Sequence, residues 1–324
     1  MIADEVIRND WHVVHRSADL ADGEVRKVHL LGKDLAVWRT GGHAMAWLDL
    51  CIHRGSRFTM GRVEDGEIVC PYHGWRYGPS GQCTLIPSQP DVPVPKRARA
   101  ITYHCKEQYG LIWVCMGEPS DDIPTLPEWD DPEFVNVHTG PYAFSAAGPR
   151  VVENVLDVTH FPFVHADFLG ASSEPDKIGA YEVRREADGL RTSPIRVFQP
   201  VADHRRIPVE TTYTFWCPRP LIGYLMKTID EERRFSHFMP ITPVNDVECI
   251  LWVLTSANYE KDDAEARIKA RNDEIFAQDK AIVENQRPAQ IPLDLKQELH
   301  VRADKLHVAY RRWLHDLGVT TEAA

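Results

Sequence analysis

Hydrophobic and polar residues alternate in short runs over the first part of the chain. The stretches 11–17, 25–40 and 44–50 are rich in β-branched and aromatic residues, and glycine and aspartate separate them, as in strands that are joined by tight turns. The apolar stretch 109–117 closes this series. The pattern predicts a small all-β domain at the N-terminus.

A segment rich in proline and acidic residues follows, over residues 118–134. Proline restricts the backbone without supporting helix or sheet, so such a segment is typical of an ordered connector. We therefore predict a domain boundary here, with a first domain of residues 1–120, a linker over 118–140 and a second domain of residues 141–324.

The rest of the chain mixes helical and strand periodicities. The pattern predicts a helix at about 150–161, several strands between 180 and 257, and a long helix at about 259–285. We expect an α+β protein in which the second domain combines a sheet with flanking helices.

Composition and charge exclude several classes of protein. The net charge of −11 argues against general affinity for nucleic acids or lipid surfaces, and no apolar run approaches the roughly 18 residues that cross a bilayer. The seven cysteines have uneven spacings and follow no signal peptide, which indicates a reducing compartment. We expect a soluble, cytoplasmic protein that binds neither nucleic acid nor membrane.

Two cysteines and two histidines lie close together between predicted strands. They form the pairs Cys51-x-His53 and Cys70-x-x-His73, and the sequence PYHGW completes the second pair. Two thiols and two imidazoles could hold a structural zinc, and the ligand types alone favour that interpretation. The surrounding short strands, in place of a zinc-finger helix, favour a Rieske [2Fe–2S] centre, which this motif resembles. By that resemblance the two thiolates hold one iron and the two imidazoles hold the other.

A second group of polar residues runs through the apolar first helix of the second domain. Asn154, Asp157 and His160 follow one another at intervals of three, so they share one helical face. Pro162 ends the predicted helix, and His165 follows in the turn. Buried polar groups are costly unless they are paired or bind a metal. A hydrogen-bonded core network is the alternative, but the neighbouring Cys/His motif favours a metal site.

A third ligand is predicted on the long helix. A mononuclear iron of the two-histidine, one-carboxylate type needs an oxygen ligand and open positions for dioxygen and substrate. Asp279 lies four residues after Ile275 and three before Ile282, so it points with the apolar face that also holds Phe276 and Val283. Surface salt bridges are the alternative for acidic residues on this helix, and we assign them to Asp262, Asp263 and Glu274.

Together the two motifs resemble the oxygenase component of the Rieske non-haem iron oxygenases, over nearly the whole chain. The stretches CIHRG…CPYHGW (51–75) and NVLDVTHFPFVH (154–165) carry this resemblance. It implies an all-β Rieske domain followed by a helix-grip-like catalytic domain with an antiparallel sheet. It also implies that Asp157 connects the two redox centres, with Asn154 as a supporting residue. The ligands of the mononuclear Fe(II) would be His160, His165 and Asp279.

The resemblance extends to particular members of the family. The chain length and the stretch DKAIVENQRP (279–288) are more similar to the O- and N-demethylases and monooxygenases, such as the vanillate and dicamba demethylases, than to the longer ring dihydroxylases. The segments YGLIWVCMGEP, LPEWDDP and VAYRRWLHDLGV resemble hydroxylases of saxitoxin-type alkaloids more closely still.

The reaction that this resemblance implies is the hydroxylation or oxidative demethylation of a small organic substrate. Dioxygen is the cosubstrate, and electrons from NAD(P)H arrive through a separate reductase, with or without a ferredoxin, because the chain has no GxGxxG or flavin motif of its own. The family forms head-to-tail homotrimers, and we expect one here.

Three other functions stay open on the sequence: a ring cis-dihydroxylating dioxygenase, a Rieske electron carrier without oxygenase activity, and a zinc-stabilised binding module. The substrate is not readable from any motif. Our candidates for the pocket are Phe163, Phe168, Leu169, Tyr213, Phe215 and Phe238.

Overall fold

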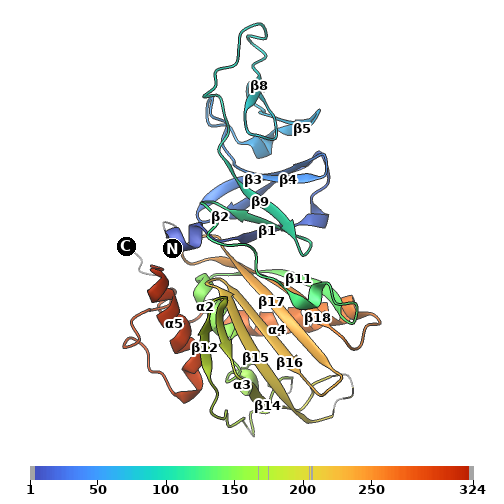
Figure 1. The fold of residues 1–324 in the computed structure, drawn as a ribbon, viewed down its shortest axis with the longest axis vertical. Helices are drawn as coiled ribbons and strands as arrows, with labels where there is room; N and C mark the ends of the chain where they lie inside the picture. The colour runs from blue at the N-terminus through green and yellow to red at the C-terminus, as the bar shows by residue number, and fades with distance from the viewer. Residues whose placement is uncertain (1–3, 167, 174, 204, 206, 321–324) are drawn as a thin grey trace. The chain divides into compact units, whose positions relative to one another are not determined.

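The computed structural model describes residues 4–166, 168–173, 175–203, 205 and 207–320. Contacts divide the chain into two units, of which the first ends at Asp122 and the second begins at Ile123. Each unit has its own sheets (Figure 1). No helix in the described part of the chain combines the length and the hydropathy needed to span a bilayer.

The regular structure of the first unit is mostly antiparallel strands, which confirms the predicted all-β domain. One sheet has six strands in the order β1-β10-β9-β4-β3-β2, and the other has four in the order β5-β6-β7-β8. The strands are β1 (His12–Arg16), β2 (Val25–Leu30), β3 (Lys33–Thr40), β4 (His43–Leu48), β5 (Arg62–Glu64), β6 (Glu67–Val69), β7 (Arg76–Tyr77), β8 (Cys83–Leu85), β9 (Thr102–Gln108) and β10 (Leu111–Cys115). Short helical turns are α1 (Glu5–Arg8), η1 (Ser17–Asp19) and η2 (Phe58–Met60).

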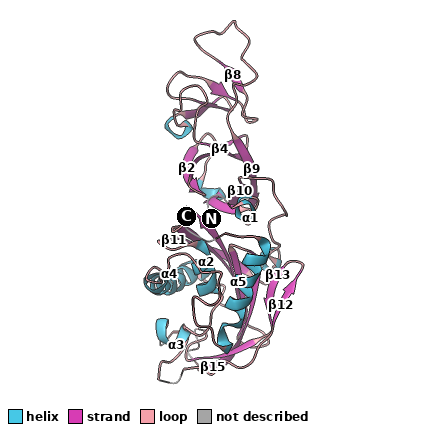
Figure 2. Cartoon of the chain, turned by 90° about the vertical axis from the view of Figure 1, so that its left-hand side faces the viewer, coloured by secondary structure: helices cyan, strands magenta, loops and turns pink. Residues whose placement is uncertain are grey.

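The second unit combines an antiparallel sheet with helices, as the α+β prediction requires (Figure 2). The sheet order is β11-β18-β17-β16-β15-β13-β12, and β14 pairs with β15. The strands are β11 (Val135–Phe144), β12 (Val183–Glu186), β13 (Gly189–Thr192), β14 (Ile195–Gln199), β15 (Val209–Arg219), β16 (Ile222–Thr228), β17 (Arg234–Pro243) and β18 (Cys249–Ala257). The helices are η3 (Pro127–Trp129), α2 (Gly148–Val155), α3 (Phe161–Val164), α4 (Ala264–Val283), η4 (Arg302–Asp304) and α5 (Lys305–Leu317).

The helices cover one face of the large sheet. Helix α2 contacts β16 and β17, and α4 contacts β11, where the rings of Tyr142 and Phe276 lie 5.0 Å apart. Because strand side chains alternate between faces, Phe235, His237 and Met239 of β17 point to the same side. That side is the one toward α2 and α4, so the space between sheet and helices is lined from both.

Helix α5 is tied to α2 by buried charges. Arg311 of α5 donates two hydrogen bonds to Glu153 of α2, at 2.7 Å and 2.8 Å. Arg150 of α2 donates to Glu298, which lies between α4 and α5 in the chain, at 2.7 Å. Both arginines are buried, so the pairing that compensates their charge also fixes α2 against the C-terminal helix.

The helix predicted at 150–161 is shorter than expected. Helix α2 ends at Val155, and a turn leads into α3, which begins at Phe161. Pro162 lies in the first turn of α3, where its missing N–H group costs nothing, so it helps to start a helix and does not end one. Asn154, Asp157 and His160 therefore do not share one helical face, and the turn brings them together.

Candidate active site

The loops that carry the Cys/His motif repeat one turn. The N–H of Gly55 donates to the carbonyl of Cys51 at 2.9 Å, and the N–H of Gly74 donates to the carbonyl of Cys70 at 3.1 Å. Both glycines have positive φ, +71° and +69°, where a side chain would be strained. The chain therefore presents its two cysteines in the same local conformation.

The four donors of these loops fit a Rieske cluster. Cys51 and Cys70 are buried, and the rings of His53 and His73 lie 4.5 Å apart between centroids. The buried Nδ1 of His53 has no hydrogen-bond partner in the described part of the chain, as expected of an atom reserved for a metal. Burial raises the pKa of the Cys51 thiol, and the hydroxyl of Tyr77, 3.2 Å from Sγ, opposes that shift. Cluster iron would replace the thiol protons.

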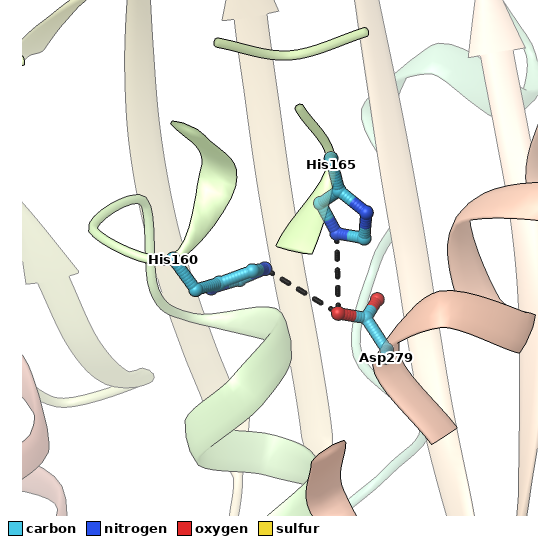
Figure 3. A group of neighbouring side chains, drawn as sticks. All are labelled: His160, His165 and Asp279. Atoms are coloured by element: carbon cyan, nitrogen blue, oxygen red, sulfur yellow. Dashed lines mark ion pairs between the residues drawn. The ribbon is translucent and has the colours of Figure 1, made fainter. Parts of the chain in front are cut away.

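The second unit holds a separate group of converging donors. Nε2 of His160 lies 3.4 Å and Nε2 of His165 lies 3.1 Å from Oδ1 of Asp279 (Figure 3). The three ligand atoms lie within 4.8 Å of one another. His160 and His165 lie at the two ends of α3, and Asp279 lies in the last turns of α4. Segments more than a hundred residues apart therefore meet at one point.

Hydrogen bonds hold both imidazoles in the orientation that a metal needs. Nδ1 of His160 lies 2.8 Å from Oδ2 of Asp157, and Nδ1 of His165 lies 2.7 Å from Oε1 of Gln278. Each acceptor keeps a proton on Nδ1, so Nε2 of each ring is the free donor atom that faces Asp279. Two imidazoles and one carboxylate, with the remaining directions open, are the donor set of non-haem Fe(II) oxygenases.

Electrostatics at this point favour a bound cation. Burial alone lowers the pKa of His160, but its hydrogen bonds with Asp157 and Asp279 outweigh that effect and raise the pKa to about 9. Burial raises the pKa of Asp279, but the hydrogen bonds with His160 and His165 outweigh it and bring the pKa down to about 2. A divalent metal would take the place of the proton on Nε2 of His160, which faces Asp279, while Asp157 keeps the proton on Nδ1.

Asn154 supports the carboxylate ligand. Its Nδ2 donates to Oδ1 of Asp279 at 3.0 Å, while its own Oδ1 is buried without a hydrogen-bond partner in the described part of the chain. Asp279 is only 3% exposed, whereas Ile282, which we placed on the same inward face of the helix, is 50% exposed. The inward face of α4 is therefore narrower near its end than the apolar pattern indicates.

A cavity of about 50 Å³ opens onto the three converging donors. Its apolar walls come from α2, α3, α4 and the sheet, and include Val155, Phe161, Leu225, Met239, Ile275 and Phe276. Among the pocket candidates from the sequence, Leu169 and Tyr213 line this cavity. Apolar walls of this kind exclude water and suit the apolar part of a small organic molecule.

The other four pocket candidates do not line this cavity. Phe163 is 63% exposed on α3, and Phe238 points to the opposite side of β17 from His237 and Met239. Phe168 and Phe215 lie beyond the lining, Phe215 stacked on Tyr213 with centroids 6.2 Å apart.

The sequence did not single out three polar residues that shape the site, although His237 lies in the strand 235–238 that offered pocket candidates. His237 and Arg271 line the cavity, and Gln278 holds His165. Arg271 precedes Ile275 and Asp279 at intervals of four, a helical spacing that could have revealed it. Nothing in the local sequence distinguishes His237 or Gln278.

The chain matches two family models that correspond to its two units. They are the Rieske [2Fe-2S] domain, over residues 10–96, and the vanillate O-demethylase oxygenase C-terminal domain, over residues 144–319. The methylxanthine N1-demethylase NdmA of Pseudomonas putida is 30% identical over 97% of this chain and 90% of that protein. This chain belongs to the Rieske non-haem iron oxygenases. This oxygenase is also 27% identical to the methylxanthine N3-demethylase NdmB of Pseudomonas putida, over 97% of this chain and 90% of that protein.

Solved structures show the same fold. NdmA of Pseudomonas putida CBB5 with caffeine superposes with a TM-score of 0.80 at 28% identity, covering 96% of this Rieske oxygenase and 91% of that chain. Dicamba monooxygenase bound to dicamba superposes with a TM-score of 0.79 at 21% identity, covering 96% and 97%. The closer likeness to alkaloid hydroxylases stays a prediction.

Family membership confirms the predicted cofactors and reaction class. The enzyme is an oxidoreductase that uses a [2Fe–2S] Rieske cluster, a mononuclear iron, dioxygen and electrons from a separate reductase. It is a terminal oxygenase that acts on a small organic substrate.

Proposed function

We propose that this oxygenase removes an N-methyl or O-methyl group from a small ring compound by monooxygenation. Its similarity to N1- and N3-demethylases and its match to an O-demethylase domain support the reaction type. The observation that carries the proposal is the convergence of His160, His165 and Asp279 at the end of a small, mostly apolar cavity.

Different residues of the chain have different roles in such a reaction. A bound iron of this ligand set supplies dioxygen activation, and the Rieske cluster supplies single electrons. Asp157 and Gln278 keep the ring protons of His160 and His165 on Nδ1, which leaves both Nε2 atoms available. The apolar walls bind the substrate, exclude water and point its methyl group toward the three donors. The product of hydroxylating that methyl group releases formaldehyde.

The proposal includes an assembly and a domain assignment. Residues 1–120 form the Rieske domain with a linker over 118–140, and residues 141–324 form the catalytic domain; the matched ranges 10–96 and 144–319 support this division. A head-to-tail homotrimer brings the cluster of one subunit, held by Cys51, His53, Cys70 and His73, near the iron of the next. The Asp157 carboxylate, bonded to His160, would then connect the two centres. Free cysteines throughout the described chain support a cytoplasmic location.

A turnover screen tests the reaction. The purified enzyme, with an NAD(P)H-dependent reductase, is given N-methylated, methoxylated and unmethylated ring compounds, and oxygen uptake, formaldehyde and products are measured. We expect formaldehyde in equal amount to the dioxygen consumed with at least one methylated compound. A cis-dihydrodiol without formaldehyde would show a ring dioxygenase, and electron transfer without oxygen uptake would show an electron carrier, and either result overturns the proposal.

A matched pair of variants ties the reaction to the proposed ligand. Asp279→Ala should keep the Rieske spectrum and lose most of the mononuclear iron and the formaldehyde, because two imidazoles alone bind the ferrous ion weakly. Glu274→Ala, on the exposed side of the same helix, should keep both. An Asp279→Ala enzyme with full iron and turnover would remove Asp279 from the ligand set.

A further inference from the structure

Arg271 stands out among the residues of the cavity. It lies eight residues before Asp279 on α4, about 12 Å along the helix at 1.5 Å per residue. Its guanidinium packs against the rings of Phe168 and Phe235, at 5.7 Å and 5.9 Å from their centroids. No described residue accepts a hydrogen bond from its N–H groups or forms an ion pair with it. The five N–H donors of the Arg271 guanidinium are therefore available to a ligand at the end of the cavity away from the metal ligands.

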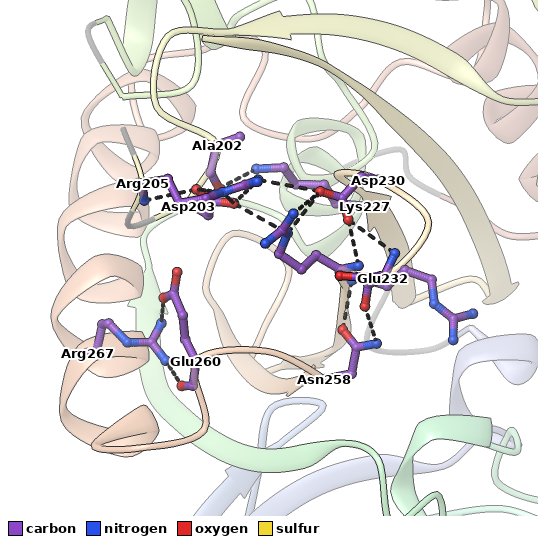
Figure 4. A network of polar contacts seen from close by, with 11 residues as sticks. Ala202, Asp203, Arg205, Lys227, Asp230, Glu232, Asn258, Glu260 and Arg267 are labelled. Atoms are coloured by element: carbon purple, nitrogen blue, oxygen red, sulfur yellow. Dashed lines mark hydrogen bonds and ion pairs between the residues drawn. The ribbon is translucent and has the colours of Figure 1, made fainter. Parts of the chain in front are cut away.

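The described acidic residues of the adjoining polar network pair with other cations (Figure 4). The pairs are Asp203 with Arg205, Asp230 with Arg233, and Glu260 with Arg267. Lys227 in the same network donates to the carbonyl of Ala202 at 3.1 Å. Burial, together with the positive charge of Arg271, brings the pKa of Lys227 well below its ordinary value.

A second donor faces the same cavity from the sheet. Nδ2 of Asn272 donates to Oγ1 of Thr255 at 3.1 Å, and the only described acceptor paired with the Thr255 hydroxyl is Nδ1 of His237, 2.8 Å away, so we assign the hydroxyl proton to that bond. Nδ1 then accepts, so the ring proton of neutral His237 sits on Nε2, for which no described residue serves as partner. Burial, aided by the charges of Arg271 and Lys227, lowers the pKa of His237 to about 3, which keeps the ring neutral.

The carboxylates that line the cavity cannot satisfy these donors, because both are committed to the metal ligands. Asp157 is bonded to His160, and Asp279 contacts both His160 and His165. The cavity therefore has an anionic end that suits a metal cation. Its opposite part holds two donors that no described residue satisfies, one of them charged. A ligand complementary to it carries an anionic acceptor at that second part.

We propose that Arg271 and His237 form a recognition site for the carboxylate of a small organic acid, whose methyl group then points to the metal ligands. This assignment rests on the proposed demethylation for the orientation of the molecule, but the anion site itself does not depend on turnover. The proposal makes Arg271 a residue that determines the substrate class of this enzyme. The same fold binds a neutral ligand in NdmA, whose structure was solved with caffeine.

Binding to the intact, metal-loaded enzyme tests the site without any reaction. Under anaerobic conditions and without reductase, calorimetry compares methoxybenzoates and N-methylated heteroaromatic carboxylates with their primary amides, which have the same shape and no charge. We expect at least one acid to bind at least tenfold more tightly than its amide. In Arg271→Gln this preference should vanish, Arg271→Lys should keep part of it, and His237→Phe should reduce it.

Lys280→Gln is the matched control, because it removes an exposed cation from the same helix and should leave the preference unchanged. Unaltered iron content and Rieske spectrum show that each variant is folded. Equal binding of acids and amides, binding of no acid in the series, or an undiminished preference in Arg271→Gln overturns the assignment. Acid preference without formaldehyde in the turnover screen overturns demethylation and leaves the anion site standing.

Discussion

Nδ1 of His165 lies 2.7 Å from Oε1 of Gln278, the residue directly before Asp279 on α4. One turn of helix thus supplies both a carboxylate to the metal site and the acceptor that orients a histidine from another segment. In Gln278→Leu the buried Nδ1–H of His165 loses its acceptor, and we expect iron affinity to fall about 10 to 100-fold. Competition with a chelator, followed by metal analysis, measures the change.

Gln278→Glu is the conservative comparison, because a carboxylate still accepts from Nδ1, and it should bind iron at least as tightly as the parent enzyme. The Rieske spectrum should be unchanged in both variants. Iron affinity in Gln278→Leu equal to that of the parent would mean that the Gln278 contact does not position His165.

The Rieske cluster offers a second prediction through Tyr77, whose hydroxyl lies 3.2 Å from Sγ of Cys51. A hydrogen bond to a cluster sulfur stabilises the reduced, more negative state, so Tyr77→Phe should lower the reduction potential. A spectroscopic redox titration reports the midpoint. Tyr72→Phe, which alters an exposed tyrosine of the second cluster loop, should leave it unchanged. Equal midpoints for Tyr77→Phe and the parent would contradict the predicted role.

Asp157 should control electron transfer between the centres. Asp157→Asn keeps an oxygen that can accept from Nδ1 of His160, so we expect the variant to retain both metals. If the carboxylate carries electrons across the subunit boundary, reoxidation of the prereduced cluster by oxygen and substrate should slow by about 10 to 100-fold. Stopped-flow absorbance follows the cluster directly. Reoxidation at the parental rate in a metal-replete variant would exclude Asp157 as the bridge.

His12 predicts how acid affects the first unit. The ring is buried, with Nε2 2.7 Å from the carbonyl of Ile7, and burial, opposed in part by that bond, lowers the pKa from 6.5 to about 4. The unfolded chain therefore binds a proton more readily than the folded one between these values. The contribution of neutral His12 is fully present above pH 6.5 and is lost as the pH falls toward 4, by about 3 kcal/mol in all.

Melting temperatures at pH 7.5, 6.0 and 5.0 check this prediction. In His12→Gln the amide can still donate to Ile7 but does not titrate, so the parent should lose stability on acidification faster than the variant. A difference in melting temperature between the parent and His12→Gln that stays constant over this pH range would show that His12 is not the titrating group.

The metal ligands could be predicted from the sequence where they lie close together in the chain or follow the spacing of a regular helix. Cys51, His53, Cys70 and His73 lie in two short loops, and Asp279 follows from the helical period of its neighbours. Gln278 could not be predicted in the same way, because adjacent residues on a helix point about 100° apart. The spacing that places Asp279 on the inward face places Gln278 away from it. The contact exists because His165, 113 residues away, arrives beside α4.

The donors of the proposed anion site depend still more on tertiary structure. His237 gains its orientation from Thr255 on the next strand and Asn272 on α4, and neither is near it in sequence. The turn after α2 was also missed, because Asp157 accepts from the N–H groups of Thr159 and His160 and so replaces helical hydrogen bonds. Local polar capping overrode the apolar pattern there.

The buried pairing of α2 with α5 makes the last helix matter to a cavity that its described residues do not line. A protein shortened before Lys305 loses Arg311, and Glu153 then loses the partner that holds both of its oxygens. Breaking a buried ion pair costs about 3–5 kcal/mol, and Asn154, which supports Asp279, is the next residue of the same helix. A deletion that removes the last helix should therefore weaken the metal site as well as the fold, and expressed versions of this oxygenase should keep that helix intact.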